Sequence, residues 1–157
     1  MSVDRVREYL KSYGLEDRIQ EFDVSSATVE LAAKAVGVEG ARIAKTLSFH
    51  LGDGCVLVVA AGDARIDNHK FKETFHTKAK MLTAGEAFSM TGHAVGGVCP
   101  FALPEGVRVC LDKSLQRFDT VYPAAGSASS AVKLTCAELE KSTGGEWVDV
   151  CKLPEGQ

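Results

Sequence analysis

Long apolar runs are missing from this sequence. The most hydrophobic stretch, Cys55 to Ala61, has only the length of a strand, whereas a membrane-spanning helix needs about 20 consecutive apolar residues. The first residues, Met1 to Arg5, become amphipathic at once and show neither the basic nor the apolar region of a signal peptide. We therefore expect a cytoplasmic protein that is neither exported nor inserted in a membrane.

A strong charge of one sign is also missing. The chain has 18 Lys and Arg against 21 Asp and Glu, which gives a formal net charge of −3 at pH 7. Proteins that hold a long nucleic acid neutralise many phosphates and favour a basic surface. The charge balance therefore argues against DNA as a partner and against any protein that clamps an extended nucleic-acid backbone.

Paired or regularly spaced cysteines are absent. The five cysteines are odd in number, and no two of them form a C-x-x-C pair. Without an export signal, this pattern predicts reduced thiols. Four cysteines lie in or beside apolar runs, whereas Cys99 stands in a glycine-rich loop. The histidines form no metal-ligand pattern with the cysteines, so the sequence predicts no metal and no cofactor.

What is present is the composition of one soluble globular domain. Of the 157 residues, 45% are hydrophobic and 25% are charged. A chain of this length buries roughly 70% of the surface that it exposes when unfolded. No internal repeat, low-complexity tract or linker divides the sequence, so we expect a single domain over residues 1–157.

Helical spacing and capping residues predict five helices. The second is expected from about Thr28 to Val36, with Ser25 or Ser26 as its cap and Gly37 after its end. Capping boxes are expected to open the last two helices. The other predicted helices are Ser2 to Tyr13, Asp67 to Phe75, Thr83 (with Glu86) to near Gly92, and one that begins at Thr135 with Glu138.

Alternating apolar residues predict the strands. A hairpin is expected from Ile43–Leu51 through Gly52-Asp53-Gly54 to Cys55–Ala61. Further strands are expected over residues 107–111, 118–122 and 131–134. Strands and helices are interspersed without a regular βαβ period and without a phosphate-loop glycine motif. The sequence therefore predicts an α+β fold with a mixed sheet.

Lys45 does not fit its predicted strand. The period of two along Ile43–Leu51 places this lysine on the face that carries the large apolar residues. Burying an ammonium there is costly unless a partner or a cleft receives it. One reading is a lysine whose stem covers apolar surface while its amine reaches water. The other is a cation that lines a binding site for an anionic or carbonyl-bearing ligand.

Two segments rich in small residues are further candidates. The stretch from Thr91 to Phe101 contains a glycine pair followed by a proline, and such a tight turn can point backbone amides at a carbonyl or carboxylate oxygen. It can equally be a plain connection. The segment 124–130, which includes Gly126 and Ser127, is suited to lining a pocket or to forming an ordinary turn.

In this order and spacing, these segments resemble the YbaK/prolyl-tRNA-synthetase-associated editing domains. The resemblance runs from about residue 5 to residue 152. It is carried by the helix with Thr28–Ala33, the strand Ala44–Leu47, the Gly96-x-x-x-Pro100 loop and the turn Ala125-Gly126-Ser127. It implies a β-barrel-like mixed sheet with flanking helices. It also implies hydrolysis of the ester between a wrong amino acid and the terminal adenosine of a transfer RNA.

The resemblance assigns roles and partners. Lys45 matches the family's functional lysine, and Gly96 to Pro100 match the loop that holds the aminoacyl carbonyl. The catalytic candidates are therefore Lys45, Gly96, Gly97, Cys99 and Pro100, and the substrate-binding candidates are Thr46, His93, Val98, Gly126 and Ser127. The implied partner is the acceptor end of an aminoacyl-tRNA, with an aminoacyl-tRNA synthetase as a further candidate.

These residues define the amino acid that is removed less clearly than they define the reaction. Members that edit alanyl-tRNA carry a His-Pro pair where this sequence has Tyr122-Pro123, so specificity for alanine is not implied. Small residues such as Ala125, Ser127 and Ser130 favour a small or polar substrate side chain. The resemblance implies a tRNA(Pro)-type or similar substrate that carries a small amino acid.

The residues also suggest how the ester would be cleaved. Negative charge develops on the carbonyl oxygen, and loop amides with a nearby cation stabilise it. Cys99 precedes a proline and has no identifiable partner base, so a covalent thiol mechanism is the weaker alternative. The resemblance favours attack assisted by the substrate's own ribose hydroxyl or side chain, with Lys45 and the loop holding the ester in place. His93 is either a group that faces the site or a structural histidine.

Three functions stay open. They are a freestanding trans-editing aminoacyl-tRNA deacylase, a non-catalytic domain that holds an amino-acid-like ligand or docks on a synthetase, and a different small-molecule hydrolase. The basic stretch from His69 to Lys80 is open too. It is either a local contact for transfer RNA through Lys72 and Lys78, or a solvated helix face with buried phenylalanines.

Overall fold

A six-stranded sheet forms the centre of the structure, a computed structural model that describes residues 2–94 and 96–154. Val95, within the predicted glycine loop, lies outside the described residues. The strand order is β8-β6-β2-β3-β5-β9. These strands are β2 (Ile43–Leu51), β3 (Gly54–Ala61), β5 (Arg108–Asp112), β6 (Thr120–Pro123), β8 (Leu134–Thr135) and β9 (Glu146–Val148).

The sheet mixes parallel and antiparallel pairs. β2 and β3 form the predicted antiparallel hairpin, and β3 pairs in parallel with β5 on its other side. Residues 56–61 of β3 are fully buried, as expected for a strand that is covered on both faces and therefore reads as a continuous apolar run. The sheet curls into a half-barrel, which confirms the predicted α+β, barrel-like architecture.

Two short ladders lie outside the main sheet. One pairs β1 (Ile19–Glu21) with β7 (Ser130–Val132), and the other pairs β4 (Arg65–Ile66) with β10 (Cys151–Lys152). All four strands are only two or three residues long. Three of them, β1, β4 and β10, were not predicted because so short a segment has no readable alternation.

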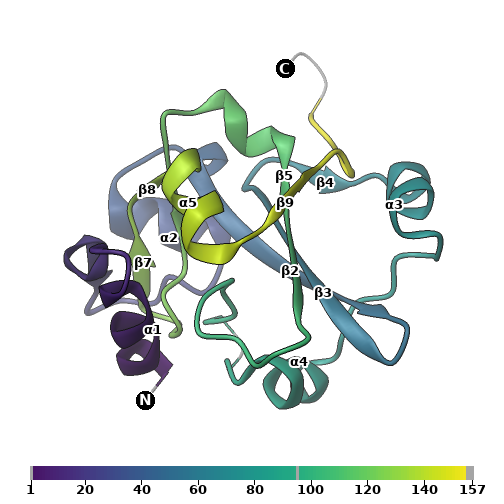
Figure 1. Ribbon diagram of the computed structural model, residues 1–157. Coiled ribbons are helices and arrows are strands. Elements are labelled where there is room, and N and C mark those ends of the chain that lie inside the picture. Colours follow the sequence, from purple (N-terminus) through teal and green to yellow (C-terminus); the bar gives the residue numbers. More distant parts are fainter. Residues whose placement is uncertain (1, 95, 155–157) are drawn as a thin grey trace.

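Five α-helices are formed by the described residues, and they flank the sheet. Figure 1 shows α5 in front of the central strands, α1 on the left, α3 on the far right and α4 below. None of the described helices is long and apolar enough to span a bilayer. The helices are α1 (Ser2–Lys11), α2 (Val29–Val36), α3 (Asn68–Phe75), α4 (Ala84–Thr91) and α5 (Cys136–Thr143).

The helix ends largely follow their predicted caps. Both predicted capping boxes are present, Thr83 with Glu86 at α4 and Thr135 with Glu138 at α5. The cap of α2 was predicted wrongly: Thr28, not Ser25 or Ser26, accepts the hydrogen bond from the N–H of Leu31, at 3.2 Å.

The predicted strand 131–134 is divided in two. Val132 of β7 pairs with Ile19, whereas Leu134 of β8 pairs with Val121. Lys133 lies between them, is exposed, and donates its N–H to the carbonyl of Arg18 at 3.3 Å. The predicted strand therefore contributes to two sheets. The exposed Lys133 separates the part that pairs with β1 from the part that pairs with β6.

Candidate active site

A cavity of about 400 Å³ opens between β2 and the chain that enters α2. The loop at Gly96 and Val98 closes one side, and β7 with Tyr122 of β6 closes another. Most of the wall is apolar, and the polar groups are hydroxyls and one ammonium. The lining residues are Ser26, Ala27, Thr28, Val29, Ala32, Ile43, Ala44, Lys45, Thr46, Leu47, Ser48, Met81, Ala84, Gly96, Val98, Tyr122, Ala124, Ser130 and Ala131.

Lys45 supplies the only ammonium among the described residues that line the cavity. Its side chain is half-buried, and its Nζ donates to the carbonyl oxygen of Gly62 at 3.3 Å and to that of Ala64. Both carbonyls belong to the turn between β3 and β4. Burial lowers the pKa of the Lys45 ammonium, while Asp63 and other nearby groups act in the opposite direction. The lysine therefore lies at the cavity with its amine held by main chain.

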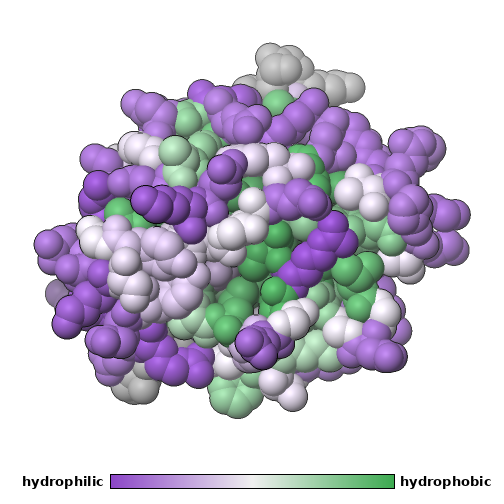
Figure 2. Space-filling model, in the orientation of Figure 1, coloured by the Kyte–Doolittle hydropathy of each residue, from purple (hydrophilic) through white to green (hydrophobic). Residues whose placement is uncertain are grey.

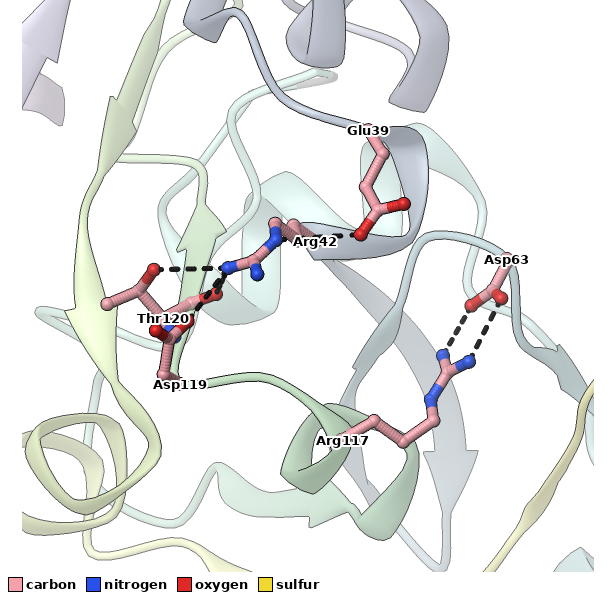
Figure 3. A network of polar contacts seen from close by, with 6 residues as sticks. All are labelled: Glu39, Arg42, Asp63, Arg117, Asp119 and Thr120. Atoms are coloured by element: carbon pink, nitrogen blue, oxygen red, sulfur yellow. Dashed lines mark hydrogen bonds and ion pairs between the residues drawn. The ribbon is translucent and has the colours of Figure 1, made fainter.

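The turn that holds Lys45 is itself held by an arginine. Arg117 donates to both carboxylate oxygens of Asp63, at 2.6 and 3.2 Å (Figure 3). This bidentate contact lowers the pKa of the Asp63 carboxyl. The position of the Lys45 amine thus depends on an ion pair between residues that are remote in the sequence.

A second arginine fixes the start of β2. Arg42 lies between Glu39, at 3.5 Å, and Asp119, at 2.9 Å, and also donates to Thr120 (Figure 3). These contacts join the residues before β2 to the first residues of β6, where Ile43 pairs with Tyr122. The two strands that line the cavity are therefore fixed in register by polar contacts at their edge.

Thr46 carries an unsatisfied polar atom in the cavity wall. Its Oγ1 is buried and has no hydrogen-bond partner among the described residues. Buried hydroxyls without a partner are rare in native structures, and a bound ligand or water is the usual explanation. Thr46 is one of the described residues that line the cavity, and its role in substrate binding stays a prediction.

The glycine loop (within residues 91–101) packs against the small-residue turn (residues 124–130). A Cβ at Gly96, whose φ is +83°, would lie 3.0 Å from the Cβ atoms of both Ala27 and Ala128. A Cβ at Gly97 would lie 2.7 Å from the carbonyl carbon of Gly126 and from the nitrogen of Ser127. Three segments that the sequence singled out therefore converge, and glycine is required because their backbones nearly touch.

His93, Cys99 and Pro100 belong to the same loop but are not among the described residues that line the cavity. All three are buried, and the first two have no exposed surface. His93 Nε2 is 2.8 Å from the carbonyl oxygen of Phe101 and 3.5 Å from Cys99 Sγ. Since a neutral imidazole must donate to bind that carbonyl, Nε2 carries the proton and ties together the two ends of the loop.

Burial determines the protonation of this pair. It lowers the pKa of His93 and raises the pKa of the Cys99 thiol to about 12. The neutral imidazole and the protonated thiol are therefore the favoured forms. Neither group belongs to the described lining of the cavity.

The turn predicted at Gly126 and Ser127 supports the cavity from outside. Ser127 Oγ donates to Ser130 Oγ at 2.9 Å, and Ser130 lines the cavity. Of the ten predicted site residues, Lys45, Thr46, Gly96 and Val98 reach the cavity itself. Gly97, Gly126 and Ser127 form the layer behind its wall.

Several lining residues were not predicted. Ser26 was considered only as a helix cap, Ser48 only as a member of the polar strand face, and Met81 was not considered. Tyr122 was predicted as the end of a strand and noted for its place before a proline, but not as a site residue. The sequence gives no signal for these residues, because they come from four separate segments and none stands in a motif. Only the tertiary structure brings them together.

The chemistry available at the cavity is polarisation and positioning. Among the described residues, its lining contains no Asp, Glu, His or Cys, and no group of three such residues is placed to hold a metal ion. Val98 is a lining residue whose backbone N–H has no partner in the part of the chain that the structure describes. An ammonium and an amide can stabilise negative charge on an oxygen, whereas a proton acceptor has to come from water or from the ligand.

Comparison with known proteins identifies relatives over nearly the whole chain. The chain is 52% identical over 154 residues to the uncharacterized protein YwhH of Bacillus subtilis. The aligned region covers 97% of this chain and 98% of that protein. A solved structure, described as a candidate trans-editing enzyme for prolyl tRNA synthetase, superposes with a TM-score of 0.88 at 30% identity. That match covers 96% of this chain and 97% of the other.

Longer proteins contain a similar region. The proline–tRNA ligase of Streptococcus thermophilus is 27% identical over 131 residues, which is 83% of this chain but 21% of the ligase. The chain thus spans about a fifth of that relative. The model of the aminoacyl-tRNA editing domain matches residues 23–142, which include the cavity lining, the glycine loop and the small-residue turn. This chain belongs to the aminoacyl-tRNA editing domain family.

Proposed function

We propose that residues 1–157 act as a single, freestanding editing domain that hydrolyses the ester of mischarged transfer RNA in trans. The observation that carries this proposal is the cavity itself, whose described lining is mostly apolar and includes the cation Lys45 and Val98 of the glycine loop. The relatives support it, since they include a proline–tRNA ligase and a candidate trans-editing enzyme.

The proposed reaction needs little from the protein beyond placement and charge. Water adds to the ester carbonyl carbon, and the negative charge that develops on the carbonyl oxygen is stabilised by the Val98 amide and the Lys45 ammonium. The bond to the ribose oxygen then breaks, that oxygen takes up a proton, and the products are the free amino acid and the terminal hydroxyl of the transfer RNA. The described cavity lining contains no carboxylate, imidazole or thiol, so this proposal assigns the proton acceptor to a group of the substrate or to water.

The cavity favours a small or polar amino acid. Its wall includes the hydroxyl-bearing residues Ser26, Thr46, Ser48 and Ser130 among apolar side chains, several of which are alanine, in a volume of about 400 Å³. Cys99 has no part as a nucleophile in this proposal, since its thiol is fully buried and protonated.

A panel of transfer RNAs that carry different small amino acids tests activity and specificity together. Loss of ester over many cycles supports the proposal. The Lys45→Ala variant should lose about 10²-fold in kcat, the usual effect of removing one group that stabilises the oxyanion. Lys34→Ala, on the exposed side of α2, is the matched control and should leave turnover unchanged. Full deacylation by folded Lys45→Ala would remove the lysine from the mechanism.

A second candidate function is a non-catalytic domain that retains an amino-acid-like ligand or docks on a synthetase. It is favoured by the lack of a carboxylate, imidazole or thiol in the described cavity lining. Stoichiometric binding of the charged transfer RNA, without release of free amino acid, would support this alternative over hydrolysis.

A further inference from the structure

A second hollow, of about 430 Å³, lies beside α3 on a part of the surface that the proposed reaction does not use. It is lined by Asn68, His69, Lys72, Lys78 and Ala79, and we call it the α3 groove. Figure 2 shows hydrophilic side chains over α3, at the right edge of that face. The groove gathers two lysines that are six positions apart in the most basic stretch of the chain.

The aromatic residues of this stretch do not take part in the surface. Phe71 and Phe75 are buried, with ring centroids 4.7 Å apart, and Phe71 packs on Phe49 at 4.9 Å. Packing of this side of α3 in the core directs the opposite side, with Lys72, to solvent. The groove therefore offers positive charge and no exposed aromatic ring for stacking.

The charge of the groove is not neutralised by the protein. Lys72 and Lys78 are exposed, and neither forms an ion pair within the part of the chain that the structure describes. The nearby Lys70 differs, since its amine pairs with Asp149 at 3.0 Å. Glu73, the acidic residue next to Lys72 in α3, has its carboxylate 2.9 Å from His69. The two lysines thus remain free for an anion.

The segment from Lys78 to Met81 links the α3 groove to the cavity. The segment that follows Lys78 runs beside β2: the N–H of His50 donates to the carbonyl of Lys80 at 2.9 Å, and Phe49 forms a bridge with Met81. Met81 lines the cavity, whereas Lys78 lines the groove. Three residues of extended chain span about 10 Å, and phosphates along one strand recur about every 3.4 Å of helix rise.

We infer that the α3 groove binds the phosphates of the acceptor strand while the terminal ester occupies the cavity. This inference rests on the proposed function, because it takes transfer RNA as the ligand of the cavity. The distance places Lys72 and Lys78 within reach of the phosphates that precede the terminal nucleotide. A chain of net charge −3 can in this way hold a single-stranded end through a local contact, without a basic surface overall.

The test compares two double variants that remove the same charge. Lys72→Ala/Lys78→Ala removes the groove lysines, and Lys11→Ala/Lys141→Ala removes exposed lysines of α1 and α5. Binding to an uncharged acceptor-stem RNA with a single-stranded 3′ end is measured by fluorescence anisotropy between 50 and 200 mM salt, conditions under which phosphate contacts change affinity strongly.

Loss of two single-strand phosphate contacts should reduce the slope of log K against log salt by about 1.4 and weaken binding about tenfold at 0.15 M salt. The Lys11/Lys141 variant should match the unmodified protein. An unchanged slope for Lys72→Ala/Lys78→Ala would overturn the inference, and so would an equal loss in both variants, which would indicate a general charge effect.

Hydrolysis assays separate this inference from the proposed function. With charged transfer RNA, the groove variant should raise KM and leave kcat unchanged. With an aminoacyl-adenosine ester, which has no phosphates, it should match the unmodified protein; an equal loss on this small ester would overturn the inference. If no ester of the panel is hydrolysed but the groove variant still loses RNA affinity, the proposed function fails and the groove stands as an RNA contact.

Discussion

Replacing Gly97 with alanine tests whether the glycine loop and the turn at Gly126 form one rigid unit. The added Cβ would lie 2.7 Å from two backbone atoms of the turn and 2.8 Å from the carbonyl oxygen of Gly126. Ordinary van der Waals contact begins at 3.4 Å, so the loop and the turn have to separate by about 0.7 Å. All three contacts are with backbone, and no side chain can rotate away to relieve them.

The expected cost has two components. Overpacking of this kind destabilises a protein by about 1–3 kcal/mol, which urea unfolding measures directly. A displacement near 1 Å at a positioning group can lower a rate about 10²-fold, so kcat for deacylation should fall steeply because the Val98 amide follows Gly97 in the loop. Loss of stability without loss of activity would show that the loop does not position the ester.

Gly85→Ala is the matched control for this change. Gly85 lies in α4, and a Cβ there meets nothing within 4 Å. Gly85 lies in the first turn of the helix, where alanine is tolerated without strain, so this variant should be at least as stable as the unmodified protein and fully active. If Gly97→Ala unfolds at the same urea concentration as the unmodified protein and retains its kcat, the close approach described for the loop and the turn is refuted.

Three other outcomes follow from the buried polar groups. Because Arg117 lowers the pKa of Asp63, their pair stabilises the fold above pH 4 and loses this contribution as the pH falls through the lowered value; urea unfolding of the unmodified protein and of Asp63→Asn should therefore converge at acid pH. Iodoacetamide at pH 8 should leave Cys99 unlabelled in the folded protein but label the partly exposed Cys136, as peptide mapping would reveal. His93→Ala should lower the free energy of unfolding by about 2–4 kcal/mol, because it leaves a cavity and an unpaired carbonyl; a change below 0.5 kcal/mol would contradict its structural role.

The elements that could be predicted are those whose signal is local. The hairpin from Ile43 to Ala61 follows from alternation and a glycine turn, and the helix ends at Thr83 and Thr135 follow from capping boxes. Each of these signals depends on residues within one turn or strand. The short strands β9 and β10 lack such a signal, since they exist only through pairing with distant strands.

The candidate site was predictable to the extent that single residues conflict with their surroundings. Lys45 is conspicuous in an apolar strand face, and the adjacent glycines 96 and 97 are conspicuous in a loop. Ser26 and Met81 carry no such conflict, and only the three-dimensional arrangement brings them to the cavity. His93 shows the reverse difficulty: a histidine beside a glycine loop invites a functional reading, whereas its burial and its bond to the Phe101 carbonyl indicate a structural tie.

The carbonyl contacts of Lys45 have a consequence for the electric field in the cavity. A carbonyl oxygen accepts a hydrogen bond without bringing a net charge, so Gly62 and Ala64 orient the ammonium but do not cancel it. The nearest carboxylate in the same turn, Asp63, is already compensated by Arg117. These three ionised side chains together retain one net positive charge. A partner carboxylate on Lys45 would have fixed the amine equally well but would have removed the attraction for an anionic transition state.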